Sequence, residues 1–160
     1  MILVLIGVVV VSAVYWLLSP ATPIVHRRLS VARFATLVDV LYRRGFDGGE
    51  LRVRVADSDE PILRLVKSIV VDDDVRLGLE LAQLDDLSSD ERINLDRALG
   101  WFGLPVPGLR QSLDLGGDSK RAAAIARAIL EEGFRLNLHR DCAVTLHDVS
   151  ERNIRIGWTR

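Results

Sequence analysis

Three side chains that can bind a soft metal ion lie close together near the C-terminus: His139, Cys142 and His147. A zinc site would need these side chains to converge with a fourth donor, such as Asp141 or Asp148. If this stretch is a strand, His139 and Cys142 point to opposite faces, because an odd number of residues separates them. A turn between the two residues would restore convergence. We therefore expect no metal site and no cofactor, and the alternative function is a small metal-binding sensor or enzyme that uses these three residues.

Other patterns that could support chemistry are incomplete. The acidic runs at 72–74 and 85–86 lack the spaced oxygen ligands and central glycine of a calcium loop, so we interpret them as solvated turns. Residues 116–120 (Gly-Gly-Asp-Ser-Lys) lack the spacing of a phosphate-binding loop and are typical of a helix cap. No serine lies in a Gly-x-Ser-x-Gly elbow. The sequence thus gives no positive case for an enzyme, and we expect no catalytic residues.

Charge and cysteine content narrow the class of protein. The chain has 21 Lys and Arg against 22 Asp and Glu, a formal net charge of -1. Without a basic stripe, nucleic acid is not expected as a partner. The single cysteine, Cys142, excludes an intramolecular disulfide and favours a reducing compartment.

Residues Met1 to Leu18 predict a membrane-spanning anchor. From Ile2 to Leu18 the only ionisable side chain is the phenol of Tyr15. A helix of this length spans about 27 Å, close to the hydrocarbon thickness of a bilayer. We therefore expect residues 1–19 to be the anchor and the lipid bilayer to be a partner through residues 1–18. A cleaved signal peptide is the competing interpretation, although no Lys or Arg precedes the apolar run.

The residues after the anchor predict its orientation. His26, Arg27 and Arg28 follow the apolar run closely, and the positive-inside rule places them in the cytoplasm. The prediction is a single-pass protein of the cell membrane with a linker at 20–29 and a cytoplasmic α+β domain at 30–160.

Hydrophobic periodicity gives the elements of that domain. Helices are predicted from Ser30 to Gly45, after the capping-box pair Ser88 and Glu91, and from Asp118 to Gly133. A turn at 47–49 and alternating residues at 51–55, 62–71 and 75–81 predict a three-stranded antiparallel meander. Further strand-like runs lie at 113–115, 134–138, 143–146 and 154–158. The expected fold is an antiparallel sheet packed against helices on one face.

One arrangement after the meander resembles a known family. It consists of Leu87, Ser88, Leu95 and Leu99-Gly100-Trp101, followed later by an alanine-rich helix. In this order of elements, the chain resembles the Tir-chaperone/YbjN-like domains of bacteria, which are related to type III secretion chaperones. The resemblance implies an α+β domain that is non-enzymatic and forms dimers or binds proteins.

These observations give one expected function. The chain is predicted to be a membrane-anchored, non-enzymatic protein-interaction or chaperone-like module, with a protein partner or a homodimer. The aromatic residues Trp101, Phe102 and Trp158 could anchor a partner, but we interpret each of them as a core residue. No residue of a protein-binding site is assigned from the sequence.

Overall fold

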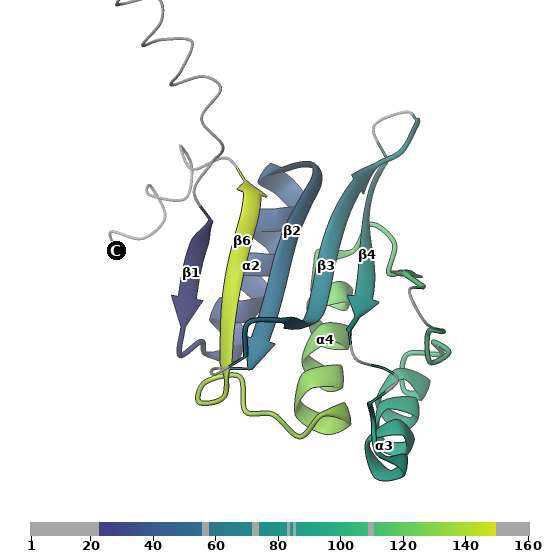
Figure 1. Cartoon of the computed structure of the whole chain (residues 1–160). Helices are drawn as coiled ribbons and strands as arrows, with labels where there is room; N and C mark the ends of the chain where they lie inside the picture. Colours follow the sequence, from purple (N-terminus) through teal and green to yellow (C-terminus); the bar gives the residue numbers. More distant parts are fainter. Residues whose placement is uncertain are drawn as a thin grey trace, which may run out of the picture.

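A computed structural model of the chain describes residues 23–55, 58–71, 74–82, 84, 86–108 and 111–149. These residues form one sheet with helices packed against it (Figure 1). The strands are β1 (Ile24–Arg27), β2 (Gly45–Val55), β3 (Pro61–Ile69), β4 (Val75–Leu81), β5 (Leu113–Asp114) and β6 (Cys142–Val149). The helices are α2 (Val31–Arg44), α3 (Ser89–Gly100) and α4 (Ser119–Ala128), the last continued by a π-helical turn, η2 (Ile129–Gly133).

The six strands lie in the order β1-β6-β2-β3-β4-β5, and each neighbouring pair is antiparallel. The consecutive strands β2, β3 and β4 form the expected meander. The last strand, β6, lies between β1 and β2. The α+β fold with an antiparallel sheet packed against helices is therefore confirmed.

Local sequence signals fix the ends of the helices. The Ser30 hydroxyl accepts a hydrogen bond from the backbone N–H of Arg33 at the start of α2. Ser88 and Glu91 form the expected capping box of α3, and the Asp118 carboxylate caps α4. These side chains satisfy backbone N–H groups that have no partner within their helix. The three predicted helix starts are confirmed.

The helices cover one face of the sheet. Figure 1 shows α2 and α4 behind the strands and α3 beyond one end of the sheet. The strand residues that face α2 and α4 are fully or almost fully buried: Leu51, Val53, Leu63, Leu65, Leu77, Leu79, Val144 and Leu146. Their alternation with polar residues assigns every second strand residue to the opposite face. We call this opposite side the open face.

Three predictions about the chain path were wrong. The range expected to be a linker, 20–29, contains strand β1, which pairs with β6 from Ile24 to Arg27. The turn expected at 47–49 is part of strand β2, which begins at Gly45 directly after α2. The pairing of β2 with β6 shifts register between Gly45 and Glu50, where these residues lie. The alternating residues 134–138 form no strand; Phe134 and Leu136 pack against the core, and Leu138 is buried in it.

The predicted anchor, Met1 to Leu18, and the strand-like run at 154–158 lie outside the described residues. Among the residues that the structure describes, no helix has the length and apolar character needed to cross a membrane.

Candidate functional site

The three candidate metal ligands do not come together. Cys142 is buried on the side of β6 that faces the helices, where its register partner is Val55. His147 lies on the open face opposite Glu50, and His139 is exposed in the turn before β6. Within the described ranges, no group of three or more His, Cys, Asp and Glu side chains is placed to hold a metal ion. Burial, more than the charges of Asp141 and Glu131, raises the pKa of the Cys142 thiol to about 11. The geometry therefore does not favour the alternative metal-dependent function.

The aromatic residues considered as partner anchors differ in exposure. Trp101 is 61% exposed just after α3, whereas Phe102 is half-buried against the core. A core position for Trp101 is therefore wrong. Trp158 lies outside the described residues.

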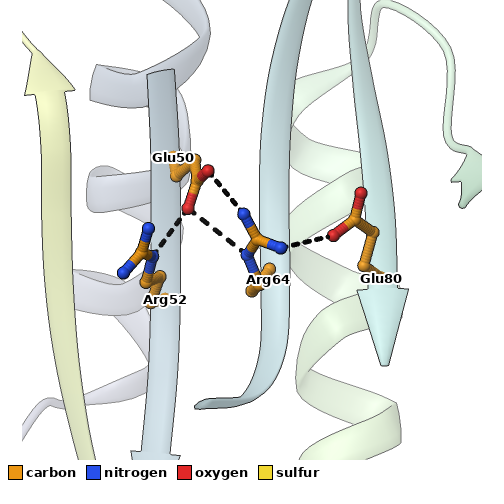
Figure 2. Close-up of polar contacts among 4 residues, drawn as sticks. All are labelled: Glu50, Arg52, Arg64 and Glu80. Atoms are coloured by element: carbon orange, nitrogen blue, oxygen red, sulfur yellow. Dashed lines mark hydrogen bonds and ion pairs between the residues drawn. The ribbon is translucent and has the colours of Figure 1, made fainter. Parts of the chain in front are cut away.

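The open face carries a network of charged side chains across three strands (Figure 2). Glu50 Oε2 lies 2.6 Å from Arg52 Nε, and Glu50 Oε1 lies 2.5 Å from Arg64 Nη2. Arg64 Nη1 continues the network to Glu80 Oε2 at 2.9 Å. Figure 2 shows Arg64 between the two carboxylates. Each side chain in the network restricts the rotamers of its neighbours, so the face presents its charges in a defined arrangement.

Glu50 is the centre of this network. Its side chain is only 15% exposed, and burial alone would raise its pKa. The hydrogen bonds from Arg64 and Arg52, together with their charges, outweigh burial, so the pKa of Glu50 lies below its usual range. The hydrogen bond to Glu50 is also the largest cause of the raised pKa of Arg64. Glu50 is therefore ionised at neutral pH and holds both guanidinium groups.

A pocket of about 220 Å³ opens beside the network, above β6. Register explains its position. Val25 of β1, Thr145 of β6 and Arg52 of β2 lie in one row across the sheet. Val25 and Thr145 both have short side chains beside the long side chain of Arg52, which leaves a hollow. The pocket is lined by Pro23, Val25, Arg52, Arg54, Asp59, Pro61, Thr145 and His147.

Two polar groups of the pocket, unlike the charged network, lack a hydrogen-bonding or ionic partner among the described residues. Thr145 is 5% exposed, and its Oγ1 atom has no hydrogen-bond partner within the described part of the chain. Arg54 makes no salt bridge with any described residue. Burial and the charge of Arg52 lower the pKa of His147, against the opposite effect of Glu50 and Asp148. His147 is therefore neutral at pH 7, and the two arginines provide the positive charge of the pocket.

A larger hollow of about 720 Å³ lies beside α3 and includes the exposed Ile93. One of its polar groups, Arg92, already donates a hydrogen bond to the Leu84 carbonyl at 3.2 Å. No polar side-chain atom lining this hollow is both buried and without a partner among the described residues. The open face is therefore the better candidate for specific recognition.

The sequence indicated part of this site. Alternation at 51–55 predicts that Arg52 and Arg54 share the solvent side of a strand. It does not reveal that Thr145 and His147 lie beside them, because that depends on the pairing of β6 with β2. No family model, curated protein or solved structure matches this chain.

Proposed function

We propose that the chain is a membrane-tethered, non-enzymatic protein-interaction module that holds a protein partner on the open face of its sheet. The observation that carries this proposal is the asymmetry of the sheet. Helices cover one face, and the other face holds the ordered charged network of Glu50, Arg52, Arg64 and Glu80. A fixed pattern of both signs favours selective recognition, because a wrong partner meets like charges.

The chaperone-like resemblance supports the same class of function. The arrangement from Leu87 to Trp101 is similar to that of Tir-chaperone/YbjN-like domains, and those domains bind proteins or dimerise. In this chain the arrangement forms the loop before α3, the helix itself and its C-cap. Membership of that family and the chaperone-like role are part of the proposal.

Tethering follows from the apolar run at 1–18. We propose that this segment spans the cell membrane once and that the sheet domain faces the cytoplasm, since Arg27 and Arg28 follow the run. Fusion of a reporter after Arg160 tests the orientation. Reporter activity only on the outer side of the membrane would overturn it.

Photo-crosslinking in the native host tests the interaction. A benzoylphenylalanine placed at Ser68, which is exposed on the open face, should give a discrete protein adduct. The matched control is the same residue placed at Ala124, exposed on α4. Equal adduct patterns from both positions, or none from Ser68, would refute binding on the open face. If the adduct contains a second copy of the chain, the partner is that copy and the protein is a homodimer.

A further inference from the structure

We propose that the pocket formed by Arg52, Arg54 and Thr145 binds the carboxylate of an aspartate or glutamate side chain presented by the protein partner. This inference rests on the proposed function, because it names the chemistry that the open face recognises. The pocket lies on the same face as the charged network and shares Arg52 with it.

The charge of the pocket fits a single negative group. Its lining has two arginines and one carboxylate, Asp59, and His147 is neutral at pH 7. Arg52 is already paired with Glu50, so Arg54 is the arginine of the lining that has no salt bridge to a described residue. This one guanidinium complements a monoanionic carboxylate. A phosphoryl group carries nearly two negative charges at this pH, so Asp59 and the nearby Glu50 would repel it more strongly than they repel a carboxylate. A carboxylate is therefore the better match.

The hydrogen-bonding groups fit the same ligand. Arg52 is held in place through its Nε by Glu50 at 2.6 Å, so its orientation is set before a ligand arrives. Arg54 has no ionic partner in the described part of the chain, and a guanidinium binds a carboxylate through paired N–H donors. The Thr145 hydroxyl is a third donor, buried and not used by the described protein.

The dimensions fit one side chain. Pockets for drug-sized ligands measure about 300 Å³ or more, whereas this one measures about 220 Å³. Its other walls, Pro23, Val25 and Pro61, are apolar and suit the methylene groups that carry an acidic head. The pocket also lies next to β1, at the edge of the sheet, and helices α2 and α4 lie on the other face.

Binding of a small probe tests the pocket directly. The full chain, labelled with ¹⁵N-arginine and held in lipid nanodiscs, is titrated with Nα-acetylglutamate N-methylamide. The Nε–Hε resonances of Arg52 and Arg54 should shift and saturate. The uncharged glutamine analogue should produce no saturable shift. Equal shifts with the two analogues, or tighter binding of the phosphoserine analogue, would overturn the inference.

Two variants separate a binding role from a structural one. Arg54→Gln should weaken binding of the glutamate analogue about tenfold or more, because a charged hydrogen-bond donor is lost. Thr145→Val keeps the shape and strand preference of the residue, so it should weaken binding severalfold without lowering the thermal midpoint. The control is Arg43→Gln on α2, on the other side of the sheet, where the side chain is 71% exposed. Unchanged affinity in both pocket variants would refute the assignment.

The partner is tested by combining these variants with crosslinking. If the partner provides the carboxylate, Arg54→Gln should reduce the adduct formed from position 68, and Arg43→Gln should not. A persistent adduct together with no response to the glutamate analogue means that the pocket inference fails while the proposed function stands. If the analogue binds but position 68 gives no adduct, a protein partner does not provide the carboxylate, and the proposed function is refuted as well.

Discussion

Replacing Glu50 with glutamine tests whether the charged network stabilises the open face. The wild-type carboxylate accepts hydrogen bonds from both Arg52 and Arg64 and is 15% exposed. A glutamine keeps the size of the side chain but loses the charge, and its amide N–H₂ would face an arginine donor. A buried charged hydrogen bond contributes about 1.5–3 kcal/mol, and an exposed ion pair contributes about 0.2–1 kcal/mol. Because the two arginines are 38% and 34% exposed, we expect a cost of about 1–2 kcal/mol.

Urea unfolding of the full chain in detergent micelles, followed by far-UV circular dichroism, measures this cost. Glu80→Gln is the matched control, because Glu80 contacts only Arg64 in the network and is 39% exposed. We expect that control to cost about 0.5 kcal/mol or less. Equal losses for the two variants would refute the central role of Glu50.

The same substitution changes the dependence of stability on pH. The pKa of Glu50 is lowered in the folded chain, so its contribution is present above the unfolded value of about 4.3 and is lost as pH falls through the folded value. The difference in unfolding free energy between wild type and Glu50→Gln should therefore shrink below about pH 4. A difference that stays constant from pH 7 to pH 3 would contradict this origin of the stability.

Three further predictions concern the buried thiol, a close backbone contact and a helix cap elsewhere in the domain. The Cys142 thiol, with a pKa of about 11, should react with Ellman's reagent at pH 8 roughly a hundredfold more slowly in the folded chain than in urea. Equal rates would show that the thiol is accessible. Gly45→Ala should cost about 1–3 kcal/mol, because an added Cβ would lie 2.5 Å from the Leu41 carbonyl oxygen. Gly100→Ala, where the Cβ meets nothing within 4 Å, should be neutral or slightly stabilising in the same urea assay. Ser88→Ala should cost about 1 kcal/mol through loss of the capping box, visible as a lower urea midpoint.

The sequence predicts well those features that depend on neighbouring residues. Ser88 and Glu91 need only each other to form a capping box, and only a few residues separate the neighbouring strands at 51–55, 62–71 and 75–81. The meander and the helix starts could therefore be predicted from spacing alone.

Features that depend on distant residues could not be predicted. Strand β1 forms because β6 provides its hydrogen-bond partners, more than a hundred residues later in the chain. Lys67 is another case: alternation places it on the side of the helices, where an apolar residue is expected. It is 5% exposed, and its Nζ donates to the Gly45 carbonyl at 2.8 Å, although burial lowers its pKa. The register of β6 against β2 likewise brings Thr145 beside Arg52, and no local pattern encodes it.

The position of β6 in the sheet has a consequence for biosynthesis. The strand is the last one described in the chain, yet it lies between β1 and β2. While the ribosome is still translating, the meander can form. Until β6 is made, however, neither β2 nor β1 has its neighbouring strand, and the apolar side chains of β2 are not covered on that side. The nascent domain therefore exposes a sheet edge until β6 emerges, which is the condition in which unfinished sheets associate wrongly. An mRNA truncated before the codon of Cys142 should yield an aggregation-prone product that binds cellular chaperones. A truncation after Val149 should not, because every described strand is then present.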